Sequence, residues 1–408
     1  MPAIQRICAV DRRFPLPPGA GSDAVHTGSE YCLAVTELHG SQALTGSGFA
    51  LTLGQGNRLV CDAIEILASP LLGQDIEELM SDFGNVTRGL ADNATMRWLG
   101  PHKGVVHLAL ASIVNACFDL WAKSRGVPLW QLLLDLEPDS FVNLLDLSYL
   151  EDVLDRSAAL AMLERERGTR ARRMGILSSG YRGYDTSVGW LGYDDATVEQ
   201  LIHQARQRGF NAFKLKVGSS DASRDLRRAA MLRKTAGDDA LIMFDANQQW
   251  SVPAAIRMSH ALGELNPLWI EEPTHPDDLQ GHRQISDAIA PVRVAAGEHI
   301  PNRVLFKNFM AAGALHFVQA DCTRLAGVSE FLVVSLLARH YGLPVVPHVG
   351  DMGQIHQHLV LFNHIALGHR ALFLEYIPHL RPYFQTPANV EDGLYKTPRH
   401  IGASTDLK

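Results

Sequence analysis

Cysteine is scarce in this sequence, and the few copies do not pair. Five cysteines are scattered over 408 residues, and none belongs to a C-x-x-C motif. An odd number of isolated thiols is typical of a reducing compartment and provides no zinc site. The N-terminal residues also lack the apolar stretch of a signal peptide. We therefore expect a cytoplasmic protein.

Long apolar runs and blocks of like charge are missing as well. No apolar run approaches the length of about 18 residues that crosses a bilayer, so we expect no membrane-spanning segment. The formal net charge is −7, and the only cluster of one sign is a short basic patch near Arg165 to Arg173. This distribution argues against nucleic acid as a partner. A small anionic substrate stays compatible, because a local site can be positive on an acidic protein.

What is present is the composition of a large globular protein. Hydrophobic residues make up 46% and charged residues 20%, so a sizeable core can form. The length suits one large barrel plus a smaller domain. In residues 1–140, the strand patterns YCLAVTELHG and LTGSGFALTLG precede the helical patterns NRLVCDAIEILASPLLG and VVHLALASIVNACFDLWAKSRG. Strands followed by helices predict a separate α+β domain.

From about residue 141 to 380, short apolar strands alternate with amphipathic helices. FVNLLDLSYL is the first expected strand, and later units begin with AFKLKVG, ALIMFDAN, PLWIEEP, VRVAAGEH, LHFVQADCTR and PVVPHVG. Repeated βα units predict a (β/α) barrel of the TIM type, with residues 380–408 packing back on the first domain. A doubly wound open sheet would give the same alternation. No G-x-G-x-x-G follows any strand, so dinucleotide binding has no support.

Residues 166–195 interrupt this alternation. They are polar, basic and Gly-rich, and predict a long loop before the AFKLKVG strand. Within them, SVGWLGY is too apolar and aromatic for disorder. We therefore expect an ordered loop at the functional site.

The stretch AFKLKVGSS, residues 212–220, places two lysines in an otherwise apolar run. In a strand, the period of two sends Lys214 and Lys216 to one face. The apolar Phe213, Leu215 and Val217 then occupy the other face. Two ammonium groups on a buried strand repel each other and are costly to desolvate. A strand built only for packing would not carry them, so we infer that they serve an anionic ligand.

Three carboxylates end the next three strands. Asp245, Glu271 and Glu298 are spaced 26 and then 27 residues apart. Because the C-terminal ends of barrel strands meet at one mouth, these carboxylates should converge there. Converging carboxylates repel unless a cation joins them, and oxygen ligands without His or Cys favour Mg²⁺ over zinc. The sequence therefore predicts a Mg²⁺ site with positions open to substrate oxygens.

Lys216, Asp321 and His348 have the residue types of an acid–base system. Removing a proton beside a carboxylate creates an enediolate, which Mg²⁺ and a nearby ammonium stabilise. A neighbouring lysine and a divalent cation should lower the pKa of Lys216, as a base requires. Asp321 ends the strand before His348 and can orient its imidazole as a general acid.

The motifs KLKVG, DAN, WIEEP, GEH and PH occur in an order that resembles the mandelate racemase group of the enolase superfamily. More narrowly, GSDAVHT, RWLGPHKGVVHLALASIVNACFDLWAK, DTSVGWLGY, WIEEPTHPDDLQGH, NRVLFKN and EYIPHL resemble L-fuconate dehydratases. The resemblance covers nearly the whole chain. It implies an α+β capping domain over a modified barrel, bound Mg²⁺ and dehydration of an acid sugar.

Matched residue by residue, the resemblance implies the same three metal ligands and the same base and acid. Lys214 would lie beside the base on the substrate carboxylate. The further substrate contacts would be Glu375 on the last strand, His26, Thr27 and Trp190. Asn247 either contacts the metal shell or only shapes the strand end.

The segment PHVGDMGQIHQHL departs from the Gly-rich turn expected after the catalytic His. Asp351 replaces a Gly there, and it could bind a substrate hydroxyl or be a solvated turn residue. An acidic side chain at the mouth would repel a second carboxylate, so we expect a monocarboxylate substrate. His356 and His358 cannot share a helical face, which favours ordinary helix or loop positions over a metal pair. We expect Glu272 to be a structural ion-pair partner.

The sequence thus predicts a Mg²⁺-dependent dehydratase that converts a monocarboxylate acid sugar, L-fuconate or a relative such as D-arabinonate or L-galactonate, into a 2-keto-3-deoxy acid. A racemase or epimerase would use the same two groups as opposed bases, and a galactarate dehydratase would share the site. A Schiff-base lysine aldolase is an alternative of another class that needs no metal. We expect a small-molecule substrate, no nucleic-acid or membrane partner, and a homo-oligomer.

Overall fold

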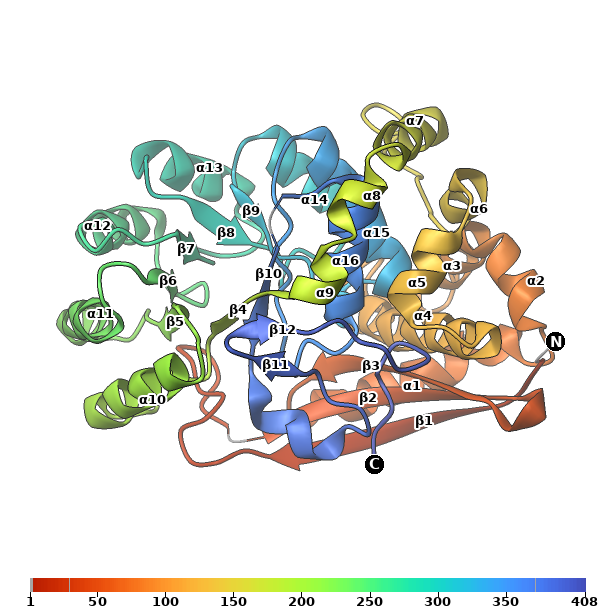
Figure 1. The fold of residues 1–408 in the computed structure, drawn as a ribbon, viewed down its shortest axis with the longest axis horizontal. Helices are drawn as coiled ribbons and strands as arrows, with labels where there is room; N and C mark the ends of the chain where they lie inside the picture. Colours follow the sequence, from red (N-terminus) through yellow and green to blue (C-terminus); the bar gives the residue numbers. More distant parts are fainter. Residues whose placement is uncertain (1–2, 29, 371) are drawn as a thin grey trace.

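The computed structural model describes residues 3–28, 30–370 and 372–408, and it combines an antiparallel sheet, a barrel and a cluster of helices (Figure 1). The antiparallel sheet has the order β1-β2-β3, formed by Ile4–Pro15, Glu30–Gly40 and Thr45–Thr52. The helices that follow it are α1 Gly56–Leu67, α2 Ile76–Ser81, α3 Phe83–Ala91, α4 Gly104–Arg125, α5 Leu129–Asp135 and α6 Pro138–Val142.

Helix α4 packs closely on β3, and two glycines make the approach possible. A Cβ on Gly46 or Gly48 would overlap the backbone of α4 at Ala116. The helix ends where Gly126 takes a left-handed conformation with φ 69°, which glycine adopts without strain. By length and hydropathy α4 could cross a membrane, contrary to the expectation that no apolar run is long enough. In this fold 89% of its most apolar window is buried.

The second part is a ring of parallel strands. Its strands are β4 Tyr181–Asp185, β5 Ala212–Lys216, β6 Leu241–Asp245, β7 Trp269–Glu271, β8 Val294–Ala296, β9 Phe317–Val318 and β10 Phe373–Tyr376. Val345 bridges to β9, and β10 pairs with β4. The predicted barrel is therefore confirmed over the open doubly wound sheet.

Seven helices alternate with these strands on the outside of the ring (Figure 1). They are α10 Asp195–Gln207, α11 Ala222–Ala236, α12 Val252–Gly263, α13 Leu279–Ala288, α14 Arg303–Ala311, α15 Gly327–His340 and α16 His356–Leu367. Helices α10 to α14 bury an apolar face against the barrel, whereas α15 and α16 are buried on almost all sides.

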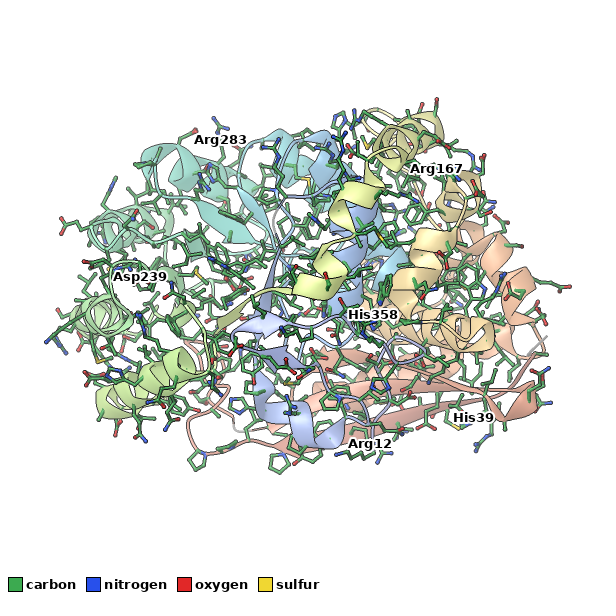
Figure 2. The ribbon with its side chains drawn as sticks, viewed as in Figure 1. Arg12, His39, Arg167, Asp239, Arg283 and His358 are labelled. Atoms are coloured by element: carbon green, nitrogen blue, oxygen red, sulfur yellow. The ribbon has the colours of Figure 1, made fainter. Side chains whose placement is uncertain are left out.

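The period of two decides what fills the ring. Each strand sends alternate side chains inward, and the inward set forms one packed layer. Its members are Tyr184, Ala212, Met243, Trp269, Ala295, Phe317, Val346 and Phe373. In Figure 2 the labelled Arg283 lies at the edge of the molecule, whereas His358, which is fully buried, lies near the middle of the view. The barrel centre is thus filled by side chains.

Several expected elements differ from the structure. FVNLLDLSYL forms no strand, and the first barrel strand is β4, inside the stretch expected to be a loop. The helix that follows, α7 Arg156–Arg167, agrees with the sequence pattern, whereas the short helices α8 Arg170–Arg173 and α9 Ile176–Ser179 lie in the stretch expected to be a loop. Strand β1 was not predicted, because its RICAVDRR sequence carries too many charges for the apolar pattern.

The C-terminal segment returns to the N-terminal helices, and Figure 1 shows it beside the antiparallel sheet. After the hairpin β11 Val390–Glu391 and β12 Leu394–Tyr395, which extends the sheet at β4, Asp406 Oδ1 lies 2.7 Å from Lys123 Nζ on α4. Asp119 Oδ1, also on α4, accepts a hydrogen bond from the Ala403 amide at 2.7 Å. The domain boundaries near 140 and 380 stay predictions.

Candidate active site

A cavity of about 260 Å³ lies between the barrel mouth and the antiparallel sheet. Barrel strand ends supply Lys216, Asn247, Glu298, His348 and Glu375, and the loop after β4 supplies Trp190. The N-terminal part closes the other side with Asp23, His26, Tyr31, Thr52 and Leu53. Seven of the residues singled out in the sequence thus line one cavity, whereas Lys214, Asp245, Glu271 and Asp321 do not line it.

The two lysines of β5 are held by carboxylates from other strands. Lys214 Nζ lies 2.5 Å from Glu271 Oε1, 2.8 Å from Glu375 Oε1 and 3.6 Å from Asp245 Oδ2. Lys216 Nζ lies 2.6 Å from Asp245 Oδ2 and 5.5 Å from the Trp190 ring centre. Both lysines thus share one face of the strand, as the alternation predicted, and binding of an anionic ligand there stays a prediction.

In this structure burial works against the charged form of Lys216, but the carboxylates of Asp245, Asp23 and Glu298 together raise its pKa above the usual lysine value. The lowered pKa expected beside a bound Mg²⁺ stays a prediction.

The three carboxylates lie on adjacent strands, and their convergence on one cation stays a prediction. Asp245 and Glu271 are register partners in β6 and β7, and Glu298 follows β8. Glu271 Oε2 accepts from Trp269 Nε1 at 2.9 Å and from Gln319 Nε2 at 2.7 Å. Among the described residues, the clusters whose ligand atoms lie within 4.8 Å of one another do not include this set. Lys214 Nζ bridges Glu271 and Asp245, and Lys216 Nζ contacts Asp245.

The donor set nevertheless fits a hard cation. All three groups offer oxygen, which Mg²⁺ prefers. Burial raises the pKa of Glu271 to about 8, and the nearby Asp245 and Glu375 carboxylates add to the rise. Asn247 Oδ1 is buried without a partner among the described residues, and Asn247 lines the cavity. A divalent cation would balance the buried negative charge and would give Asn247 Oδ1 a partner.

His348 lies between two carboxylates. Its Nδ1 is 2.8 Å from Asp321 Oδ2, and its Nε2 is 2.7 Å from Glu298 Oε2. Because each ring nitrogen faces a carboxylate oxygen, both carry a proton and the ring is an imidazolium. Burial opposes this charge, but Glu298 and Asp321 outweigh burial and raise the pKa of His348 well above its usual value. The group is therefore poised to donate a proton.

Glu375 connects the two sides of the cavity. One carboxylate oxygen accepts from Thr186 Oγ1 at 2.6 Å, and the other accepts from the Val349 amide at 2.9 Å. It also binds Lys214. Glu375 thus fixes the lysine on one side and the backbone beside His348 on the other.

Two predicted substrate contacts lie elsewhere. Thr27 is exposed and does not line the cavity. Asp351 is 2% exposed, and its Oδ1 accepts from the Gly353 amide at 2.6 Å. Because the short turn after His348 folds inward, Asp351 lies behind the cavity wall rather than at its mouth. The predicted contact between Asp351 and a substrate hydroxyl is therefore wrong. With it we withdraw the argument that Asp351 repels a second substrate carboxylate.

Sequence reasoning missed three neighbours of the site. Asp23 Oδ2 binds His26 Nδ1 at 2.9 Å on the cavity wall. Arg324 lines the cavity and has no side-chain hydrogen bond or ion pair within the described ranges. His356 contacts Asp321, although ordinary packing was expected for it. Arg324 follows Asp321 by three residues, and this spacing could have suggested that Arg324 belongs to the site. No sequence pattern indicated the contact of His356 with Asp321.

Glu272 takes the structural role expected for it. Its Oε1 lies 2.7 Å from His299 Nδ1, and its Oε2 accepts from Gln248 Nε2 at 2.8 Å. His299 Nδ1 also lies 3.1 Å from Glu298 Oε1. This pair supports Glu298 from the side opposite His348.

Comparisons with known proteins agree with this architecture. Residues 197–408 match the family model "Enolase C-terminal domain-like". L-galactonate dehydratase of Hypocrea jecorina is 40% identical over 98% of this chain and 90% of its own length. The crystal structure of human mitochondrial enolase superfamily member 1 superposes with a TM-score of 0.96 at 40% identity, covering 100% of this chain and 94% of that one. L-talarate/galactarate dehydratase from Salmonella typhimurium LT2, liganded with Mg and L-lyxarohydroxamate, has a TM-score of 0.76 at 25% identity and covers 98% and 90%.

Proposed function

This chain belongs to the enolase superfamily, and we propose that it is a Mg²⁺-dependent dehydratase of a monocarboxylate acid sugar, of the L-fuconate or L-galactonate type. The product would be a 2-keto-3-deoxy acid. The observation that carries the proposal is that Lys216 and His348, a base and an acid, line the same cavity from different elements. The relatives that are named acid-sugar dehydratases add support.

The first step is removal of the proton on C2 by Lys216. Asp245, Glu271 and Glu298 would hold the Mg²⁺. Bound there, the cation would supply positive charge to the substrate carboxylate and draw Asp245 away from Lys216. Lys214 stays paired with Glu375 and lies beside the same carboxylate, where its ammonium favours the growing negative charge.

The second step is loss of the C3 hydroxyl. The electron pair left at C2 forms the C2–C3 double bond while the C3–O bond breaks. His348 gives its Nε2 proton to the departing oxygen, which leaves as water. Asp321 holds the ring by its Nδ1 and stabilises the imidazolium before transfer. The enol product then tautomerises to the 2-keto acid.

The distal end of the substrate would meet the N-terminal wall. Asp23 is already bound by His26, and two backbone amides donate to its Oδ1 at 2.6 and 2.7 Å. Arg324 is free to donate to hydroxyl oxygens. The L-galactonate relative at 40% identity supports a six-carbon monocarboxylate.

One observation favours a second candidate, an aldarate dehydratase. The guanidinium of Arg324 could bind a distal carboxylate as well as hydroxyls, and Asp351 is not at the mouth to repel it. Galactarate turning over faster than every monocarboxylate would select this candidate. The cytoplasmic location and the homo-oligomeric state expected from the sequence stay part of the proposal.

A screen of acid sugars with semicarbazide detection of 2-keto acids tests the proposal. We expect a positive reaction with at least one C6 monocarboxylate, and loss of that reaction with EDTA. A C2 epimer without any keto acid would assign a racemase or epimerase. EDTA-resistant turnover together with inactivation by borohydride and substrate would assign a Schiff-base aldolase.

A further inference from the structure

Asp321 binds two histidines, and the proposed reaction uses only one of them. Its Oδ2 faces His348 Nδ1 at 2.8 Å, and its Oδ1 faces His356 Nε2 at 2.9 Å. All three side chains are buried. His356 belongs to α16, so it approaches the carboxylate from an element separate from that of His348.

The two oxygens of Asp321 have different surroundings. Oδ1 also accepts from the amide and the hydroxyl of Thr323, both at 2.7 Å, whereas His348 supplies the contact at Oδ2. The Thr323 contacts come from the same turn, two residues along the chain. His356 is the partner of Oδ1 from outside that turn, so it fixes the plane of the carboxylate.

The proton of His356 can be assigned from its contacts. The Cys322 amide also points at Nε2, at 3.2 Å, and one nitrogen cannot both donate to Asp321 and accept from Cys322. The shorter contact to an ionised carboxylate is the stronger, which places the proton on Nε2. Nδ1 is buried without a partner in the described part of the chain.

We propose that His356 is a positioning residue for the acid step: it donates to Oδ1 of Asp321 and so keeps Oδ2 aligned with Nδ1 of His348. Without it the carboxylate can turn about its Cβ–Cγ bond and bind His348 at a poorer angle. The ring of His348 would then lose the orientation needed at the C3 oxygen. His356 itself does not line the cavity and touches no substrate.

The inference rests on the proposed role of His348, and its test separates the two. His356→Leu removes the donor, whereas His356→Gln carries an amide N–H that can reach the position of Nε2. His358→Leu is the matched control, because His358 is equally buried on α16 but contacts the Trp130 amide and Ser404. Steady-state dehydration, C2 proton exchange in D₂O and ¹H–¹⁵N spectra of the histidine rings are measured on all four proteins.

We expect His356→Leu to lower kcat by about 10- to 100-fold, as loss of a supporting hydrogen bond does at other sites. In this variant KM and the rate of C2 proton exchange should stay unchanged, and the NMR signals of the His348 ring should shift. His356→Gln should restore most of kcat and the wild-type ring signals, and His358→Leu should keep both. The positioning role would be overturned if His356→Leu left both kcat and the His348 ring signals unchanged. It would also be overturned if the Gln and Leu variants lost kcat equally while the His348 ring signals did not shift. If the His348 ring signals shift in His356→Leu but the protein dehydrates no acid sugar, the positioning role is kept and the proposed function is rejected.

Discussion

Replacing Glu271 with glutamine should abolish the stabilisation of this protein by Mg²⁺. Glu271 uses both oxygens as acceptors, one for Lys214 and the other for Trp269 and Gln319. Glutamine keeps the volume but offers one oxygen, so an amide NH₂ must face either the ammonium or two N–H donors. The variant should therefore bind Mg²⁺ weakly and lose about 1–3 kcal/mol of stability from the mismatched donors.

The expected size of the metal effect follows from mass action. At a Mg²⁺ concentration one hundred times Kd, binding to the native state alone adds about 2.7 kcal/mol. For a chain of 408 residues the unfolding entropy is about 0.9 kcal/mol per degree, so Tm should rise by about 3 °C. Calorimetry with EDTA and with excess Mg²⁺ measures this rise, which the wild type should show and Glu271→Gln should lack.

The neighbouring Glu272→Gln is the matched control. Glu272 is also buried, but it contacts His299 and Gln248 instead of the lysines. It should keep the Mg²⁺-dependent rise in Tm. If Glu272→Gln lost the rise while Glu271→Gln kept it, the cation would bind the cluster of Glu272, Glu298 and His299, and the assigned ligand set would be refuted.

Further variants test the chemistry, the substrate end and the acid stability. Lys216→Ala should abolish C2 proton exchange in D₂O, whereas His348→Asn should block dehydration and leave measurable exchange; normal dehydration by His348→Asn would mean that another group protonates the leaving hydroxyl. Arg324→Gln should raise KM for six-carbon acids more than for four-carbon acids, and an equal rise would place Arg324 away from the distal end. Burial lowers the pKa of His358 in the folded state to about 3, so its stability contribution is fully present above about pH 6.5 and is lost as the pH falls from there to about pH 3. Urea unfolding from about pH 4 to 6 should show a slope near 1.4 kcal/mol per pH unit from this group, absent in His358→Gln; the same slope in both proteins would refute it.

The barrel and the lining residues Lys216, Glu298 and His348 could be predicted because they depend on local periodicity. Lys214 and Lys216 had to share a face once AFKLKVG formed a strand. The carboxylates of Asp245 and Glu298 had to reach the same mouth once the strands were parallel. These conclusions need only a period of two and a common strand direction.

What the sequence could not show depends on contacts between distant segments. The inward fold of the turn that carries Asp351 is set by packing behind the cavity, and it removed the predicted substrate contact. The pairing of His356 with Asp321 joins residues 35 positions apart. The raised pKa of Lys216 follows from the placement of Asp245, which strand assignments alone do not give. The first barrel strand, Tyr181–Asp185, was obscured because its polar and glycine content matches that of a loop.

The most direct test of the central claim is proton NMR of the purified protein with Mg²⁺ and L-galactonate or L-fuconate in D₂O. The account predicts a 2-keto-3-deoxy acid that carries deuterium at C3, formed only when Mg²⁺ is present and absent with Lys216→Ala. Accumulation of the C2 epimer with its C3 hydroxyl intact, or keto-acid formation that persists in EDTA, would contradict it.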